Sequence, residues 1–429
     1  MVLVDVWEEH LDEAAFRWTQ WERALVAPDF TLEETAKREE RLLAHLEGLE
    51  EEAALDTVVR PAFDSEEQAL ISAATYALLS LGKVDEVLVR LREGNAETRT
   101  AMSRALEVSE APGLGPALIA LLKLGDADLQ VHALGVLAFR REAAVEVLER
   151  FVLHDEPRAR MAALHGARPL SEESARRWLP ALLDSAHPGS RVAAMEAGLA
   201  SGVRGAWEAC REAVRRPSAH APETLELLSL GGDEEDTALL VTLLKTPELQ
   251  SRTLWALGFS GRVVAMEACL ALTENASVAR LAGEAFSAMT GLRLEGPYCL
   301  PPGEWPEGAP PAPEESEEPG ADLTRHPEDD LPWPEVTAVR AWWETARGRF
   351  VKGQRYLLGQ PFSGPVLLEA LESSPMRRRH VLARELAIRT RGQHVIPTRA
   401  STHRQRTAIA QARGTCARMK STPLASTLR

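Results

Sequence analysis

The sequence contains few cysteines and no long apolar stretch. Its four cysteines, Cys210, Cys269, Cys299 and Cys416, lie far apart in the 429 residues and form no pair motif. We therefore expect neither a disulfide framework nor a metal cluster, and a reducing compartment suits these thiols. No run of about 18 apolar residues occurs, so no transmembrane helix is expected. The N-terminus turns acidic at Asp5 and lacks the basic start of a signal peptide. These absences predict a cytoplasmic protein without a membrane partner.

Sequence motifs of catalytic sites are also missing. The chain has no HExxH motif, no phosphate-binding loop, and neither a GxSxG nor a GxGxxG pattern. The carboxylate pair Glu234-Glu235 shows no sign of burial and suits a solvated face. His10 and His45 have no further ligand at metal spacing. We predict no catalytic residue, no cofactor and no metal, and hence a protein that is not an enzyme.

Acidic residues are scarce in one region only. From residue 377 to residue 429 there are 13 Lys or Arg residues and one acid, Glu385. This segment therefore has a formal charge of +12, which leaves −27 for the rest of a chain whose total is −15. An acidic body disfavours nucleic acid as its partner, because neutralising phosphates requires Lys and Arg. For the basic tail, the candidate partners are the chain's own body, a separate acidic protein and, third, nucleic acid; proximity favours the first.

What the sequence does contain is an internal repeat with a period of 29 to 31 residues. Such periods are typical of solenoids of stacked helix pairs. Each copy begins with a polar residue, continues as an Ala-rich helix and ends in a second helix with apolar spacing. One pair cannot bury its apolar stripe alone, whereas stacked pairs can. The eight copies begin at Asp64, Asn95, Asp126, Glu156, His187, Ser218, Glu248 and Ser277.

Four residues after four of these starts stands an arginine. These are Arg99, Arg160, Arg191 and Arg252. We predict a structural ladder, in which each guanidinium bonds to carboxylates or carbonyls of a neighbouring repeat, because the planar fork of Arg satisfies two acceptors at once. The alternative is a basic strip that grips an acidic ligand.

Apolar spacing predicts which side of the second helices is buried. In the third copy, Val145, Leu148 and Val152 are spaced so that one stripe faces a core. The sixth copy has Pro222 where the arginine is expected. Proline is tolerated in a first helical turn, so this position indicates a shifted helix start rather than a lost repeat.

The N-terminal part predicts two helices. Residues 5–26 carry an apolar stripe on one face, and Thr31 with Glu34 forms a capping box for the second helix. One interpretation is a cap that covers the first repeat. The other is that the tryptophans of the stripe, Trp7, Trp18 and Trp21, bind a protein partner, since Trp is favoured at interface centres. The stripe consists of Trp7, Leu11, Ala14, Trp18, Trp21 and Leu25.

Composition changes after the repeats. Residues 295–334 hold 11 prolines and 11 acids but one base, which predicts an extended, solvated linker. A small helical domain follows, and Trp333, Trp342 and Trp343 near its start are further candidates for protein binding. In the basic tail, Ile409 and Leu424 are spaced too widely to predict a core.

These features resemble HEAT repeats, particularly the short phycobilisome-lyase-like type of bacteria. The resemblance rests on the polar start, the arginine, the Ala-rich helix and the Leu-rich helix. It implies an all-α fold, a right-handed superhelical α-solenoid of about seven to eight helix pairs. The expected organisation is an N-terminal helical cap (1–60), the repeat solenoid (61–294), a Pro- and acid-rich linker (295–334), a C-terminal helical domain (335–398) and a basic tail (399–429).

Three segments further resemble a bacterial family of HEAT-repeat proteins that is abundant in myxobacteria. They are residues 9–16 with 41–46, residues 283–291, and residues 330–334 with 341–343. The family implies no known catalytic residue. Several of its members are encoded beside type VI secretion components, which suggests an accessory or adaptor role.

The predicted function is therefore a non-catalytic scaffold or adaptor that binds proteins, with an accessory role in a bacterial secretion system as one form of it. The alternative is an enzyme of HEAT-like architecture. The di-iron hydroxylase of this architecture uses His-Glu dipeptides, and the chain has none. Glycosylases of this architecture need a basic concave face, which an acidic body does not supply. For a bilin lyase the sequence gives no sign of a chromophore pathway.

Overall fold

The computed structural model describes residues 2–216, 222–309 and 327–429. These residues fold almost entirely as helices, and the predicted all-α, solenoid-like fold is confirmed. Within the described ranges, the strands are β1 (Tyr356–Leu357) and β2 (Gln360–Pro361), which form one antiparallel hairpin.

The chain divides into two compact units. Unit 1 comprises Met1–Val26, Phe30–Ala197 and Ile396–Ala408, and unit 2 comprises Ala27–Asp29, Gly198–Val395 and Ile409–Arg429. Two of the divisions fall inside helices, namely α12 (Pro188–Ser201) and α22 (Thr402–Cys416), and the others fall in connecting segments.

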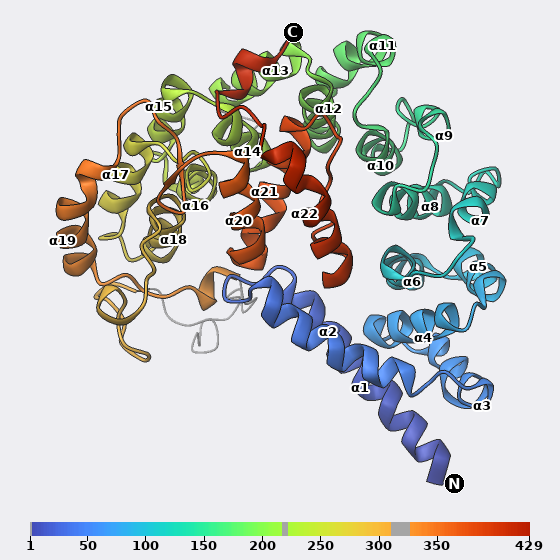
Figure 1. Cartoon of the computed structure of the whole chain (residues 1–429). Coiled ribbons are helices and arrows are strands. Elements are labelled where there is room, and N and C mark those ends of the chain that lie inside the picture. The colour runs from blue at the N-terminus through green and yellow to red at the C-terminus, as the bar shows by residue number, and fades with distance from the viewer. Residues whose placement is uncertain (1, 217–221, 310–326) are drawn as a thin grey trace. The chain divides into compact units, whose positions relative to one another are not determined.

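Unit 1 is built from two rows of helices. Helices α4, α6, α8 and α10 pack on one another in order, with α1 against α4, while α5 and α7 belong to the second row (Figure 1). The helices are α1 (Val2–Ala24), α2 (Leu32–Glu47), α3 (Glu52–Ala54), the π-helix η1 (Leu55–Val59), the 3-10 helix η2 (Pro61–Asp64), α4 (Gln68–Ser80), α5 (Val84–Glu93), α6 (Ala96–Val108), α7 (Leu114–Leu121), α8 (Ala127–Arg140), α9 (Val145–Glu149), α10 (Pro157–Ala167) and α11 (Glu172–Leu183).

In four copies, those that open with Asn95, Asp126, Glu156 and His187, the opening polar residue caps the first helix. The side chain of Asn95 accepts a hydrogen bond from the Thr98 N–H (2.9 Å), and that of Asp126 accepts one from Leu129 (3.0 Å). These bonds satisfy N–H groups that the first turn of a helix leaves without partners. The repeat in the sequence is thus a repeat of helix starts.

The second helix of the third copy is shorter than its apolar spacing predicted. Helix α9 ends at Glu149, and Val145 is 39% exposed, although Leu148 and Val152 are buried. The predicted stripe is therefore wrong at Val145. Helix α9 has little more than one turn, and Val145 is its first residue. Its side chain therefore projects outward.

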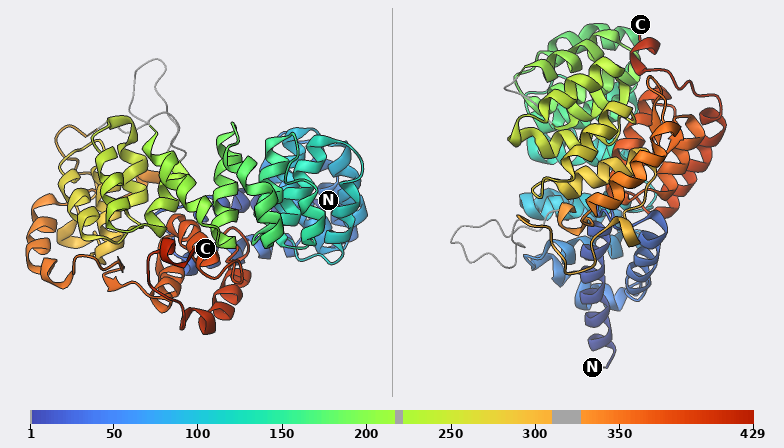
Figure 2. Two further views of the ribbon diagram at one scale, coloured as in Figure 1. Left: turned by 90° about the horizontal axis from the view of Figure 1, so that it is seen from above. Right: turned by 90° about the vertical axis from the view of Figure 1, so that its left-hand side faces the viewer.

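The N-terminal helices pack through the predicted tryptophan stripe. All six stripe residues are buried, and Thr31 and Glu34 form the predicted capping box on α2. Trp18 contacts Trp21 and Tyr76 in edge-to-face geometry. Only the first turns of α1, where Leu3 is 65% exposed, extend beyond the helices it packs against (Figure 2, right).

Unit 2 continues the repeats and adds the C-terminal helices. Helices α14, α16 and α18 pack in order, and α15 packs on α17. Helix α14 is described from Pro222 onward and packs on α16, so this repeat is present; the predicted start of that copy, Ser218, lies outside the described residues. The elements of this unit are α13 (Arg204–Arg215), α14 (Pro222–Gly231), α15 (Glu234–Leu243), α16 (Pro247–Leu257), α17 (Val263–Leu272), α18 (Ala279–Thr290), η3 (Gly296–Tyr298), η5 (Pro327–Asp330), α19 (Val336–Ala346), η6 (Arg347–Arg349), α20 (Gly364–Ser373), α21 (Met376–Arg389) and η7 (Leu424–Thr427).

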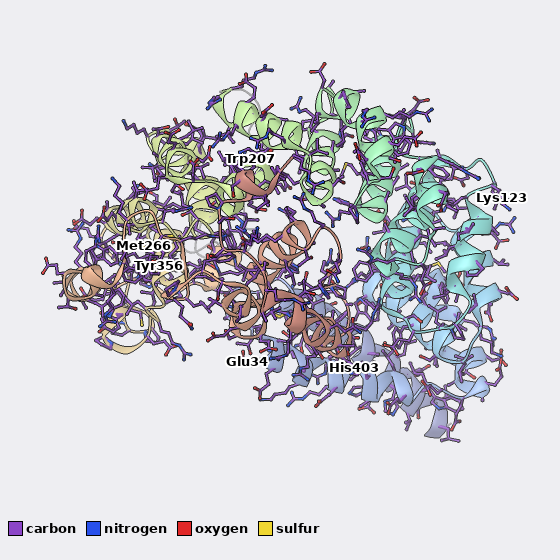
Figure 3. The ribbon with its side chains drawn as sticks, turned by 45° about the horizontal axis from the view of Figure 1, so that its top comes forward. Glu34, Lys123, Trp207, Met266, Tyr356 and His403 are labelled. Atoms are coloured by element: carbon purple, nitrogen blue, oxygen red, sulfur yellow. The ribbon has the colours of Figure 1, made fainter. Side chains whose placement is uncertain are left out.

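The hairpin β1–β2 is fixed by close backbone contact with the repeats. Tyr356, labelled in Figure 3, donates its N–H to the Gly261 carbonyl at 2.8 Å, and Leu358 donates to Ala288 at 2.9 Å. Gly261 has a φ of +63°, and a Cβ there would lie 1.9 Å from the Tyr356 oxygen. Only glycine fits this position.

The two described ends of the predicted linker pair with each other, although residues 301–305 are exposed to solvent. Leu300 donates its N–H to the Trp333 carbonyl at 2.9 Å, and Cys299 forms a bridge with Pro334. The Arg280 guanidinium lies 4.3 Å from the centre of the Trp333 ring. The predicted solvation is therefore confirmed for residues 301–305 and wrong for Leu331 and Trp333, which are buried because they supply the apolar surface that the prolines and acids lack. The centre of the linker, residues 310–326, lies outside the described residues.

The basic tail is packed, in contrast to the prediction that its apolar residues are too few for a core. Ile409 and Cys416 in α22 are 1% exposed, and Leu424 in η7 is 4% exposed. Small residues make this possible. A Cβ at Gly364 would lie 2.0 Å from the Cys416 carbonyl oxygen, so α20 and the end of α22 are in backbone contact.

Candidate functional site

A pocket in unit 1 lies across the first row of helices. We call it the unit 1 pocket; its volume is about 720 Å³. Its walls come from the end of α1, from α4, α6 and α8, and from Arg399. Stacking of one repeat on the next therefore creates this pocket, and no single helix pair contains it.

Arg104 of α6 is the centre of the polar wall. Its guanidinium bonds to Glu22 of α1, to Glu107 at 2.9 Å, and to the Arg399 carbonyl at 2.6 Å. Arg399 in turn donates to Glu22 at 3.0 Å. The guanidinium also lies 5.3 Å from the centre of the Trp21 ring, within range of a cation–π contact. Two arginines and two carboxylates thus form one network.

Burial raises the pKa of Glu107, while Arg104 and Arg399 oppose this rise and Glu22 adds to it. The network is therefore balanced in charge but expensive to desolvate. Arg404 strengthens it by donating to the Glu107 carbonyl at 3.2 Å. Arg399 and Arg404 both belong to the part of unit 1 that the sequence predicts to be the start of the basic tail.

A serine, a histidine and an aspartate follow one another at the edge of the pocket. The Ser103 Oγ and His132 Nδ1 are 3.0 Å apart, and His132 Nε2 and Asp128 Oδ2 are 3.7 Å apart. Burial lowers the pKa of His132, although the Asp128 carboxylate opposes this. This order of side chains is that of a nucleophile, a base and an orienting acid.

Because Ser103 lies within a helix, one further requirement of acyl transfer is not met. Hydrolysis through a serine needs N–H donors near the nucleophile to stabilise an oxyanion. Ser103 is the eighth residue of α6, where backbone N–H groups are used within the helix. Its 8% exposure also leaves little room for a substrate. We interpret Ser103, His132 and Asp128 as a structural contact between α6 and α8.

The side chains at the mouth of the pocket are accessible to solvent. Arg23, Thr19 and Val26 at the end of α1 are exposed, as is Thr100 on α6. The Arg23 side chain has no ion-pair or hydrogen-bond partner among the described residues. The pocket therefore presents an uncompensated positive charge beside a polar and an apolar side chain.

Most of the tryptophans that the sequence predicts to bind a partner lie outside the unit 1 pocket. Five of the six are 2–9% exposed and are packed by the chain itself, in place of the predicted partner surface, while Trp342 is half-buried. Trp342 and Trp343 pack on Phe286 with ring centres 6.0 and 5.4 Å apart. Of the six, Trp18 alone lines the unit 1 pocket. The six are Trp7, Trp18, Trp21, Trp333, Trp342 and Trp343.

Arg99 makes the contacts that the proposed ladder requires. It is 9% exposed and donates to the carbonyls of Leu91 (3.1 Å) and Arg92 (2.8 Å) at the end of α5. It also pairs with Asp126 (2.9 Å) and Asp128 (3.1 Å) at the start of α8. One side chain thus joins two successive repeats.

The other arginines of the row differ from Arg99. The Nε of Arg160 donates to the Ser190 hydroxyl at 3.1 Å, and Arg191 donates to the Ser185 carbonyl at 3.1 Å. Arg252 is exposed and has no partner among the residues described here, so the ladder does not include it.

Glutamine explains the break at Arg252. Gln250 donates to the Leu244 carbonyl at 2.9 Å and so satisfies the helix end that Arg252 was expected to reach. In the third copy, Gln130 likewise donates to Leu122 at 2.9 Å. The sequence analysis missed a further member, Arg379 of α21, which donates to the Leu371 carbonyl eight residues earlier, as Arg99 does to Leu91. The offset of eight residues was a usable signal.

The described residues contain neither a group that could hold a metal ion nor a helix that could cross a membrane. No three His, Cys, Asp or Glu side chains among them are arranged to hold a metal ion. No helix within the described ranges is long and apolar enough to cross a membrane.

Comparisons with known proteins give no family for the chain. No protein-family model matches it, and no curated protein matches it. Among solved structures, it is similar to an engineered protein at 15% identity and a TM-score of 0.31, over 90% of this chain and 98% of that one. It is also similar to human deoxyhypusine hydroxylase at 17% identity and a TM-score of 0.20, over 64% of this chain and 94% of that one. At these TM-scores we base no argument on either likeness.

Proposed function

We propose that this chain is a protein-binding helical-repeat scaffold, and that the unit 1 pocket receives an acidic segment of its partner. The observation that carries the proposal is a pocket of about 720 Å³ formed by successive repeats, with the exposed cation Arg23 at its mouth. Repeat proteins bind through the continuous surface that their stacked helices create. Arg is also among the residues that contribute most at protein interfaces.

The groups inside the pocket favour recognition over chemistry. Arg104 and Glu107 are already paired with each other and with neighbours, so they form a rigid floor. The side chains that a partner meets first are Arg23, Val26 and Thr100. A charged, an apolar and a polar group at one mouth suit a segment with both acidic and apolar residues.

The proposal is tested by blocking the pocket. Thr100→Arg places a long side chain at the mouth. Thr57→Arg is the matched control, because both threonines are exposed on helices and bond to the carbonyl four residues earlier (2.8 and 2.7 Å). Thr57 does not line the pocket.

Each immobilised protein is exposed to lysate of the cells that naturally contain it, and bound proteins are identified by mass spectrometry. We expect at least one protein that wild type and Thr57→Arg retain and Thr100→Arg loses, and that Arg23→Glu binds less well. If every captured protein binds all variants equally, the pocket is not the binding surface. The resemblance in sequence makes components of type VI secretion systems the first class to look for.

A further inference from the structure

Unit 2 contains a second pocket whose described lining is cationic. We call it the unit 2 pocket; its volume is about 430 Å³. Arg262, Lys352 and Arg355 line it together with Ser421 and Thr422, and no Asp or Glu is among the described lining residues. This is the reverse of what the acidic composition of the chain would supply.

Arg262 is a buried cation that forms no ion pair with a carboxylate among the described residues. It is 5% exposed and donates to the carbonyls of Gly353 (2.7 Å) and Gly232 (3.2 Å). Its Nε has no hydrogen-bond partner among the described residues. Burial lowers the pKa of Arg262 and the nearby Arg355 lowers it further, while Glu234 and Asp233 oppose this fall without cancelling it. Burying a charge without a counter-charge is costly, so this site gains from an anion.

The other guanidiniums beside the pocket share a single carboxylate. Arg355 and Arg389 both bond to Glu385, which is 2% exposed. The same two guanidiniums lie 4.0 and 4.9 Å from the centre of the Phe362 ring, which also lines the pocket. Glu385 therefore compensates one of these charges and leaves the other.

Other acids nearby do not make up the deficit. Asp233 and Asp236 are engaged by Arg211, at 3.3 and 2.7 Å. Glu234 accepts from a backbone N–H of the loop that carries Lys352, at 2.6 Å. With Arg211 and its two aspartates included, four arginines and Lys352 stand against four carboxylates, so the formal charge around the pocket is about +1.

We propose that the unit 2 pocket binds a phosphate monoester, held by Arg262, Lys352 and Arg355 with the hydroxyls of Ser421 and Thr422. A phosphate monoester is close to a dianion at neutral pH and is attracted by the surplus positive charge. The planar guanidinium is the side chain best suited to bind such oxyanions. A volume of about 430 Å³ lies in the range of small-molecule sites and exceeds the needs of a single ion. The site is independent of the unit 1 pocket and of the function proposed for it.

The test is isothermal titration calorimetry of the full chain with inorganic phosphate, against sodium chloride at matched ionic strength. We expect saturable binding of one phosphate per chain, and an increase in melting temperature that grows with phosphate concentration. Chloride gives neither effect. An absence of saturable phosphate binding overturns the proposal.

Three variants locate the binding. Arg262→Gln is expected to weaken phosphate binding by at least about tenfold, because a hydrogen bond to a charged group is lost. Since this buried position affects folding too, Lys352→Glu is the second variant: the side chain is exposed, and the new carboxylate repels phosphate. Lys245→Glu is the control, with the same charge change on an exposed lysine of unit 2 that does not line the pocket.

We expect Lys352→Glu to abolish measurable binding and Lys245→Glu to change the affinity by less than about threefold. Equal losses in the two variants mean non-specific attraction and overturn the proposal. Glycerol phosphate and a phosphoserine peptide distinguish the source of the group. Tighter binding of the first than of inorganic phosphate assigns a phosphorylated small molecule, and tighter binding of the second assigns a phosphorylated protein.

Discussion

Replacing Arg99 with Gln removes a side chain that joins two repeats. Gln130 shows that glutamine can bond to the end of the preceding helix, so Arg99→Gln should keep one carbonyl bond. It loses the pairs with Asp126 and Asp128. Hydrogen bonds to charged groups contribute roughly 1.5–3 kcal/mol. These carboxylates are 41% and 31% exposed, so water screens them and we expect a loss of about 2 kcal/mol.

The matched control is Arg252→Gln. Arg252 occupies the same place in its repeat but is exposed and lacks a partner among the described residues, so its replacement should change stability by less than about 0.5 kcal/mol. Thermal unfolding followed by circular dichroism measures both variants, and about 2 kcal/mol corresponds to roughly 4–8 °C in a unit of this size. Equal shifts in the two variants, or a shift near zero for Arg99→Gln, would refute the ladder.

The ion pairs of Arg99 with Asp126 and Asp128 also make stability depend on pH. The Leu129 N–H and Arg99 hold the pKa of Asp126 below its ordinary 3.8. Burial raises the pKa of Asp128, but Arg99 and other donors outweigh it, so that pKa is lowered too. Stability from a lowered pKa is present above the unfolded pKa and is lost as pH falls through the folded one. The difference between wild type and Arg99→Gln should therefore be full at pH 7 and shrink below about pH 3.8; a constant difference contradicts the ion pairs.

Three further substitutions test the packing by thermal or denaturant unfolding. Leu148→Ala should cost about 2–5 kcal/mol, because Leu148 is 1% exposed; a loss below about 0.5 kcal/mol, as at surface positions, would mean that Leu148 is not in the core. Gly261→Ala should cost clearly more than Gly308→Ala, since both have positive φ but only Gly261 has a backbone atom in the way; equal costs would exclude the close contact. Glu39→Ala should cost about 2–4 kcal/mol, because its carboxylate accepts the Thr402 N–H (2.9 Å) in a buried place; a neutral result would show that this contact does not form.

Local features of the sequence predicted the repeats well. Helix starts are set by side chains one to four residues away, so Asn95 and the pair Thr31 and Glu34 could be identified as caps without knowing the fold. The tryptophan stripe of α1 likewise predicted a buried face. The sequence could not say what buries it, and the chain itself does so rather than a partner.

Contacts between distant segments could not be predicted in this way. Glu39 bonds to Thr402, 363 residues later, and no periodicity connects them. The basic composition of the tail also concealed its packing, because much of its buried surface comes from small residues such as Ala400 and Ala412. Charge alone likewise gave no sign that Arg378 and Arg379 are buried at 4% and 0% exposure.

Neither pocket was predicted, for a related reason. Each is assembled from side chains that are ordinary in the sequence and become a site only when helices stack. Ser103 and His132 are 29 residues apart, about one repeat, which was a usable signal for residues on neighbouring helices. Arg262 and Lys352 have no such relation, since the loop that carries Lys352 lies outside the repeats.

Site-specific photocrosslinking tests the proposed scaffold function most directly. The residue p-benzoylphenylalanine is introduced at Thr100 in the mouth of the unit 1 pocket and, as a control, at Thr57, and cells containing each variant are irradiated. The proposal predicts a covalent adduct with a distinct protein from position 100, absent from position 57 and lost when Arg23→Glu is added. No adduct from position 100, or the same adducts from both positions, would contradict it.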